Sequence, residues 1–257
     1  MDAPFVALDL GNGRLKAGWF AGDRRLERTI TLAYDQVEAE WPRWVALGGA
    51  VSQAASSVVC DPALAARALA TIEAGLQVRV EPNPSSGLQL AVTSPETVGL
   101  DRLYAARGAL ARGLDGAIVV DVGTAMTVDA VRGAAESGTA AGTFLGGAIA
   151  PGPELVARSL AGADKLYEVR PSPDIPALGQ DTRAALEAGV AHTVAGAAVR
   201  LAQLVRSESG LDQAALILTG GARAFVSSAL AQAGWTPIDA PHLVLEGLAA
   251  CTAPARA

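Results

Sequence analysis

The sequence predicts an α/β protein built from two similar halves, and three observations support this. Short apolar runs that read as strands alternate along the chain with alanine-rich segments of helical spacing. A strand, a D-x-G turn and a returning strand occur at residues 5–20 and again at residues 116–131, about half the chain length apart. The 257 residues are 51% hydrophobic, enough to bury one large core or two small ones. We therefore expect two related units, residues 1–114 and 115–257, that face each other across a cleft.

The first half is expected to consist mainly of strands, with two helices. The expected strands cover residues 5–11, 14–20, 44–51, 56–60, 76–82 and 87–92. One helix is predicted to begin with Asp61 as its N-cap and Pro62 at its first position, and to end at Gly75. The segment DRLYAARGALARG has apolar residues at helical spacing and predicts a helix that ends at Gly113.

The second half is expected to repeat this pattern. Residues 116–131 predict a strand, a turn and a strand, and residues 143–162 a strand, a Gly-Pro turn and a helix. Residues 181–210 predict a long helical region that is either continuous or broken once. A buried strand that ends in LTGG, a helix and the segment at 242–253 complete the chain. Gly146 and Gly147, with Pro151 and Gly152, are expected to shape a turn, and LTGG (218–221) ends in a second glycine pair; plain left-handed turns explain both equally well.

The composition narrows the class of protein. A net charge of −6 argues against a nucleic-acid partner, since phosphate contacts need clustered Lys and Arg. Two cysteines, Cys60 and Cys251, argue against a disulfide framework or a zinc site and favour a reducing compartment. No unbroken apolar stretch is long enough to span a bilayer, and the first residues carry no basic leader region. We expect a cytoplasmic protein with no membrane partner.

The two D-x-G turns predict a site for phosphates and a cation. Asp9 and Gly11 in the first turn correspond to Asp121 and Gly123 in the second. A glycine turn aims successive backbone N–H groups at an anion, so two such turns across a cleft could grip the phosphates of a nucleotide. Carboxylates beside phosphates imply a bound cation, either Mg²⁺ through water or a monovalent ion. The alternative is that each acid only fixes its own turn.

Six motifs, in order along the chain, resemble those of type III pantothenate kinases. They are DLGNGRLK (9–16), PETVGLDR (95–102), DVGTAMTVD (121–129), GGAIAPG (146–152), GQDT (179–182) and PHLVLEGL (241–248). The resemblance implies two ribonuclease-H-like halves with mixed central sheets flanked by helices, as in the actin-like superfamily of acetate and sugar kinases, Hsp70 and actin. It also implies ATP-dependent phosphorylation of pantothenate to 4'-phosphopantothenate, the first step of coenzyme A synthesis. A homodimer, Mg²⁺ with the ATP and a monovalent cation (K⁺ or NH₄⁺) are further implications.

The same resemblance implies roles for individual residues. Asp101 would be the catalytic base, Asp121 would bind the monovalent cation, and Thr182 would contact pantothenate. The pantothenate site would be lined by Gly99, Leu100, Asp101 and Arg102. The ATP site would be formed by Asp9, Leu10, Gly11, Asn12, Gly13, Arg14, Leu15, Lys16 and Thr124. The turn at Gly146, Gly147, Pro151 and Gly152 would lie near the nucleotide, and the LTGG glycines would lie under the adenine.

The chemistry of phosphoryl transfer fits these residue types. The transition state is loose, so the base need only orient the alcohol and take its proton late. Arg102 could hold the substrate carboxylate with a two-pronged hydrogen bond. Read without the family, Asp101 and Arg102 would simply mark a helix N-terminus.

The sequence departs from the family at two positions. Gly13 stands where the family usually has Thr or Ser, and Val92 where it tends to have Tyr. Two alternatives therefore stay open: a weak or inactive member that serves as a nucleotide-binding accessory protein, and a kinase of another small alcohol.

Overall fold

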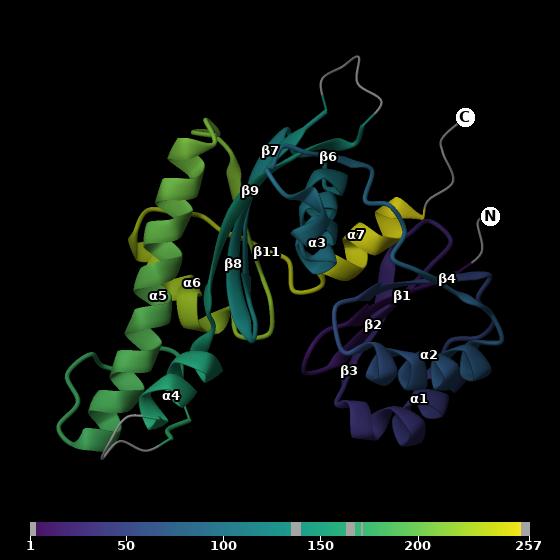
Figure 1. The fold of residues 1–257 in the computed structure, drawn as a ribbon, viewed down its shortest axis with the longest axis horizontal. Helices are drawn as coiled ribbons and strands as arrows, with labels where there is room; N and C mark the ends of the chain where they lie inside the picture. The colour runs from purple at the N-terminus through teal and green to yellow at the C-terminus, as the bar shows by residue number, and fades with distance from the viewer. Residues whose placement is uncertain (1–3, 135–139, 163–167, 171, 253–257) are drawn as a thin grey trace.

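The chain folds into two mixed sheets with helices around and between them (Figure 1). The computed structural model describes residues 4–134, 140–162, 168–170 and 172–252. The first three residues, which bear on the expected absence of a leader, lie outside these ranges.

The N-terminal sheet has the strand order β3-β2-β1-β4-β5. β1 pairs antiparallel with β2 and parallel with β4. Helices α1 and α2 cover its outer face (Figure 1). The elements are β1 (Phe5–Leu10), β2 (Leu15–Phe20), β3 (Leu26–Leu32), η1 (Tyr34–Gln36), α1 (Val37–Ala46), β4 (Gln53–Val58), α2 (Pro62–Leu76) and β5 (Val80–Pro82).

The C-terminal sheet repeats that order as β9-β8-β7-β10-β11, and β6 extends it beyond β9. Helices α5 and α6 pack on its outer face (Figure 1). The elements are β6 (Leu88–Leu90), η2 (Pro95–Thr97), α3 (Leu100–Ala111), β7 (Gly116–Val122), β8 (Ala125–Gly133), β9 (Gly142–Pro151), α4 (Pro153–Ala161), α5 (Thr182–Glu208), β10 (Ala215–Thr219), α6 (Ala224–Gln232), β11 (Ile238–Asp239) and α7 (Leu243–Cys251). The repeated strand order confirms the prediction of two similar α/β halves. The boundary between residues 114 and 115 stays a prediction.

Helices α3 and α7 cross between the two sheets, and each packs on the sheet that the other half supplies (Figure 1). α3 follows the N-terminal sheet in the chain but packs mainly on β7, β8 and β9, with a smaller contact to β4, whereas α7 contacts β1, β2 and β4. Their backbones touch, because a Cβ on Gly247 would collide with the carbonyl oxygen of Tyr104 and one on Gly108 with that of Leu243. The resulting central cluster, which includes Phe5, Tyr104 and Val119, joins both halves in one core.

Several sequence predictions for individual elements are confirmed and others are wrong. Asp61 caps α2 through hydrogen bonds of 3.0 Å from the backbone N–H groups of Ala63 and Leu64. The strand predicted at 44–51 is wrong, because residues 44–46 complete α1 and the loop that follows leads into β4. Strand β3 and helix α1 were not predicted. α2 runs one residue past Gly75, and α5 is unbroken.

Helix α5 is long and apolar enough, by length and composition alone, to cross a membrane. In this fold its apolar residues, among them Leu186, Val190 and Val194, pack on the outer face of the C-terminal sheet. Packing of this kind is what a core helix of a globular domain makes.

Candidate active site

Strand alternation turns the two D-x-G acids toward the same interior layer. On β1, Phe5 and Ala7 belong to the central cluster, whereas Val6, Leu8 and Leu10 pack under α1 and α2. Since successive side chains point to opposite faces, Asp9 faces α3 and α7. On β7, Ala117 and Val119 likewise belong to the central cluster, so Asp121 faces the same layer from the other sheet. A carboxylate thus ends each central strand where the two halves meet.

Asp101 joins these acids from the beginning of α3, whose N-cap is Gly99. Its Oδ1 accepts a hydrogen bond of 2.9 Å from the backbone N–H of Arg102. A Cβ placed on Gly99 would lie 2.6 Å from this oxygen, so the glycine leaves room for the carboxylate to fold back. The helix N-terminus favours the negative charge there.

Lys16 is the cation among these acids. Its Nζ lies 3.7 Å from Asp9 Oδ2. Burial raises the pKa of Asp9 to about 6, with Lys16 opposing and Asp101 and Asp121 adding to the rise. Burial likewise raises the pKa of Asp121 to about 6, with Lys16 opposing and Asp101 and Asp129 adding. Asp9, Asp101 and Asp121 therefore interact electrostatically, and Lys16 interacts with Asp9 and Asp121, so these four residues form one charged site.

A pocket lies between the two strand ends, lined by both halves of the molecule. Its wall is formed by Asp9, Lys16, Asp121, Thr219, Pro241, His242, Val244 and Leu245. His242, which no sequence motif singled out, contributes to this wall. Burial lowers the pKa of His242 below its usual value, so the neutral imidazole is favoured.

The raised pKa of Asp121 predicts an unusual dependence of stability on pH. A carboxyl group with a pKa near 6 in the folded chain and about 3.9 unfolded favours folding at acid pH, and this contribution is lost as the pH rises through 6. We expect Asp121→Asn to raise Tm at pH 7.5 in buffer without nucleotide, and this gain to shrink toward pH 4.5. Thermal unfolding over this pH range measures it, with the exposed Asp212 changed to Asn as the control. A gain that stays constant with pH would contradict the expectation.

Arg102 pairs with a carboxylate that the sequence analysis did not single out. Its Nε lies 3.1 and 3.2 Å from the two carboxylate oxygens of Asp129, and its Nη2 lies 2.5 Å from Oδ1. The Asp129 and Arg102 side chains are only 2% and 14% exposed. An internal acid therefore takes two of the Arg102 nitrogens, and the expectation that the Arg102 fork holds a substrate carboxylate stays a prediction.

Gly146 and Gly147 lie inside strand β9 rather than in a turn near a nucleotide, so this expectation is wrong. Gly147 pairs with Asp129 across the β8–β9 ladder. A Cβ on Gly147 would collide with Asp129 Oδ1, which explains the glycine. Gly152, also expected in such a turn, does lie beside the second turn, where its N–H donates to the Thr124 carbonyl at 3.0 Å.

The first turn spans Gly11 to Arg14 and is closed by a 3.1 Å hydrogen bond from Gly11 N–H to the Arg14 carbonyl. Leu10 and Leu15, at its flanks, are fully buried, so only their backbones could reach a ligand. A Cβ on Gly13 would meet nothing within 4 Å, so packing does not require a glycine here and leaves room for the Thr or Ser that the family usually has. In the second turn, Thr124 is exposed between β7 and β8.

Tyr34 supports the first turn from below. Its hydroxyl donates a 2.7 Å hydrogen bond to the Gly11 carbonyl. The Tyr34 side chain packs against the apolar cluster that lies under α1 and α2. Because C=O and N–H point in opposite directions across a trans peptide, this bond turns the N–H of Asn12 toward the interior layer. Burial and the neighbouring Cys60 thiol raise the pKa of Tyr34, which keeps the hydroxyl protonated. The sequence carries no local signal for this contact.

We expect Tyr34→Phe to weaken ATP binding about fivefold, since a net hydrogen bond is worth about 1 kcal/mol. The KM for ATP and calorimetric ADP binding measure it. Tyr104→Phe is the matched control, because that hydroxyl also donates to a backbone carbonyl, that of Pro84, at 2.6 Å. Equal nucleotide affinity in the two variants would show that the Tyr34 bond does not orient the turn.

The LTGG glycine lies beside Asp121. Gly220 has a φ of +91°, which favours glycine, and follows Thr219, the β10 partner of Asp121. A Cβ on Gly220 would collide with Asp121 Oδ1 and the Val122 carbonyl. The backbone of LTGG therefore comes close to the second turn, and its expected place beside the nucleotide stays a prediction.

Thr182 is not brought to these acids within one chain. It is the first residue of α5, which packs on the outer face of the C-terminal sheet, whereas α3 and Asp101 lie on the inner face. Val92 is partly buried against the central cluster.

The donor atoms of the site are oxygens, which suit hard cations such as Mg²⁺ and K⁺. Among the described residues no group of three or more His, Cys, Asp or Glu side chains could enclose a metal ion. Asp9 Oδ1 is a buried oxygen for which the described residues supply no hydrogen-bond partner. The residues present thus fit an ion that is held through water and by the substrate rather than one enclosed by protein ligands.

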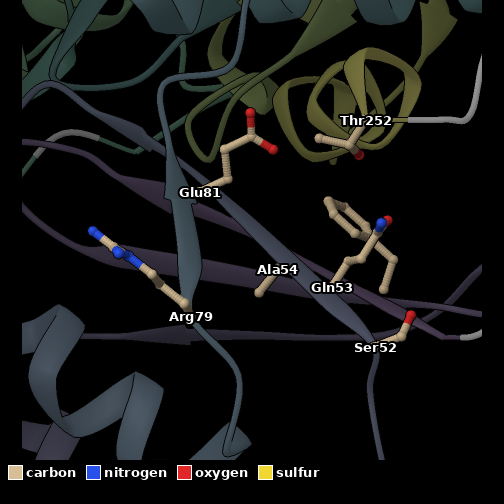
Figure 2. Close-up of a pocket in the computed structure, with 7 residues that line it drawn as sticks. Ser52, Gln53, Ala54, Arg79, Glu81 and Thr252 are labelled. Carbon is tan, nitrogen blue, oxygen red and sulfur yellow. The ribbon is translucent and has the colours of Figure 1, made fainter.

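A second hollow lies at the opposite ends of the same strands, lined by Phe5, Ser52, Gln53, Ala54, Arg79, Glu81 and Thr252 (Figure 2). Arg79 and Glu81 point in different directions, and Glu81 is turned toward the end of α7 (Figure 2). The polar groups do not converge, so the pocket at Asp9 and Asp121 is the stronger candidate.

Comparison with known proteins gives consistent matches. The family model described as Type III pantothenate kinase matches residues 5–204. The type III pantothenate kinase of Nitrosomonas eutropha is 33% identical over 95% of this chain and 92% of the relative. That of Thermomicrobium roseum is 34% identical over 84% and 85%. That of Rhodopirellula baltica is 37% identical over 67% of this chain and 61% of the relative.

Two solved structures show the fold alone. A putative Baf family transcriptional activator from Campylobacter jejuni is 19% identical, covers 96% of both chains and has a TM-score of 0.56. Component A of (R)-2-hydroxyglutaryl-CoA dehydratase from Acidaminococcus fermentans is 11% identical, with 97% and 96% coverage and a TM-score of 0.53. With the repeated strand order, they confirm the expected α/β fold of two similar halves, each a mixed sheet flanked by helices.

Proposed function

The chain belongs to the type III pantothenate kinase family, and on this premise we propose how its residues carry out the family's reaction. It is a kinase that transfers the γ-phosphoryl group of ATP to the hydroxyl of pantothenate, in coenzyme A synthesis. The observation that carries our assignment of roles is that Asp9, Asp101 and Asp121 come together from three different elements, with Lys16 3.7 Å from Asp9.

Asp101 acts as the general base. The pantothenate oxygen forms a bond to the γ-phosphorus, its proton passes to the Asp101 carboxylate, and the bond from phosphorus to the β,γ-bridging oxygen breaks to release ADP. Asp101 lies at the start of α3, near the ends of the two central strands that carry Asp9 and Asp121, and this placement supports the role. The backbones of Gly99 and Leu100 line the pantothenate site beside it.

The two turns hold the phosphates of ATP, residues 9–16 from one sheet and Thr124 from the other. Lys16 is the only cation among the described residues that line the pocket, and it offsets phosphate charge there. A cation bound near the phosphates supplies further charge neutralisation. Asp9 would hold the Mg²⁺ that accompanies ATP, and Asp121 would hold K⁺ or NH₄⁺, each supplying positive charge beside the phosphates.

Arg102 contributes to the reaction by positioning Asp101. Its pair with Asp129 fixes the first turn of α3 and so the Asp101 backbone. Thr182 reaches pantothenate from the partner subunit of a homodimer, because within one chain it begins a helix on the opposite face of the sheet. A cytoplasmic location and the absence of nucleic-acid and membrane partners complete the proposal.

The test is ATP consumption with and without pantothenate, in K⁺ and then in Na⁺ buffer. We expect turnover that depends on pantothenate and needs K⁺ or NH₄⁺. Turnover with another alcohol only would overturn the substrate assignment. Nucleotide binding without turnover on any alcohol would instead indicate an accessory protein.

A further inference from the structure

Two neighbouring serines on β4 bury their hydroxyls completely. Ser56 and Ser57 are both 0% exposed, and neither Oγ has a hydrogen-bond partner in the parts of the chain that the structure describes. Buried hydroxyls are nearly always hydrogen-bonded, so each such atom needs an explanation. Adjacent residues of a strand point to opposite faces, so the two hydroxyls lie in different environments.

Ser57 shares its face with Asp9. β1 and β4 are parallel neighbours, and their register pairs Asp9 with Ser57. Ala55, two residues before Ser57, belongs to the central cluster with α3 and α7, so Ser57 also faces this layer. Ser56 lies two residues after Ala54, which packs under α1 and α2, so the Ser56 side chain faces away from the site.

Asp9 presents a matching unsatisfied atom. Lys16, on the strand at the other side of β1, lies closest to Asp9 Oδ2. Asp9 Oδ1 is the buried atom for which no partner exists among the described residues. Two oxygens without partners, on adjacent strands and one face, therefore lie at the carboxyl ends of β1 and β4, where Asp9 borders the pocket.

We propose that Ser57 Oγ and Asp9 Oδ1 together hold a water of the hydrated Mg²⁺ that accompanies ATP. Mg²⁺ gives up its waters reluctantly and is commonly held by one or two carboxylates plus substrate phosphates. A water on the ion has two hydrogens to donate, and a carboxylate oxygen and a serine hydroxyl can both accept. This inference rests on the proposed binding of ATP at the two turns, and it makes Ser57 a positioning residue for the ion.

Ser57→Ala tests the proposal, and Ser56→Ala is its matched control, since both remove a fully buried hydroxyl from the same strand. ADP binding is measured by calorimetry over a range of Mg²⁺ concentrations and in EDTA, and the Mg²⁺ dependence of ATP turnover is measured separately. We expect Ser57→Ala to need about tenfold more Mg²⁺ for half of its effect on ADP affinity, as for other residues that orient metal ligands. Its ADP affinity in EDTA should equal that of the parent chain, and Ser56→Ala should match the parent chain throughout.

The outcomes separate this inference from the proposed function. Equal Mg²⁺ dependence in the two variants would overturn the inference and assign the hydroxyl to a structural water. A loss of ADP affinity in EDTA would also overturn it. Failure of the parent chain to bind ADP at any Mg²⁺ concentration would overturn the proposed ATP site instead. Should Ser57→Ala not fold, Ser57→Cys keeps the volume with a weaker hydrogen-bonding group, and the same shift in Mg²⁺ dependence is expected.

Discussion

Asp101→Asn is expected to lower kcat by about 10²- to 10⁴-fold, the usual contribution of general acid–base catalysis. Asparagine keeps the shape of the side chain but cannot accept the pantothenate proton. The hydrogen bond from the Arg102 N–H to Oδ1 can be retained by the amide oxygen, so the first turn of α3 should stay in place. The KM for ATP should change little, because the phosphates are held by the two turns.

Single-turnover and steady-state kinetics measure this effect, with calorimetric ADP binding to verify that the nucleotide site is intact. Glu96→Gln, at an exposed acid close by in the chain, is the control and should keep full activity. A kcat near that of the parent chain in Asp101→Asn would move the role of base to another group.

Asp129→Ala is expected to lower the free energy of unfolding by about 3–5 kcal/mol, the cost of removing one partner from a buried ion pair. The Arg102 side chain is only 14% exposed, and the variant would leave it without the acid that now accepts hydrogen bonds from two of its nitrogens. The Phe144 ring, 5.4 Å from the guanidinium carbon, does not replace a carboxylate.

Urea unfolding measures this loss, and a second ion pair supplies the matched control. Arg223 Nε lies 2.6 Å from Asp239 Oδ1, but these side chains are 32% and 61% exposed, so Asp239→Ala should cost at most about 1 kcal/mol. Arg102→Met combined with Asp129→Leu should recover much of the stability, since an apolar pair can replace a buried ion pair. Equal losses in Asp129→Ala and Asp239→Ala would show that burial does not set the value of the pair.

Much of the fold could be predicted because its signals are local. The period of two in β1 and β7 gives the strands and also the face on which Asp9 and Asp121 lie. The cap formed by Asp61 and the glycine after α3 mark helix ends by their own geometry. Helix α1 was missed because Pro42 lies within it, and proline normally argues against a helix interior.

The parts of the site that sequence reasoning missed depend on contacts between distant segments. Asp129 did carry a signal, since an acid between two apolar strand residues on an inward-facing position requires a partner. That the partner is Arg102 follows only from the packing of α3 on β8. The contact of Tyr34 with Gly11 joins residues 23 positions apart through the arrangement of two strands, and no motif encodes it.

The exchange of α3 and α7 decides which parts of the site would travel together. Arg102 and Asp129 fasten the start of α3 to the C-terminal sheet, whereas α7 is anchored on the N-terminal one. The helices meet at Gly108 and Gly247, where their backbones are in direct contact. Rotation of one sheet against the other about this point would swing Asp9 and Lys16 toward or away from Asp101, while Asp101, Asp121 and Asp129 kept their mutual spacing. Closure of the two sheets around the triphosphate would then be the same movement that brings the Asp101 carboxylate close to the phosphates.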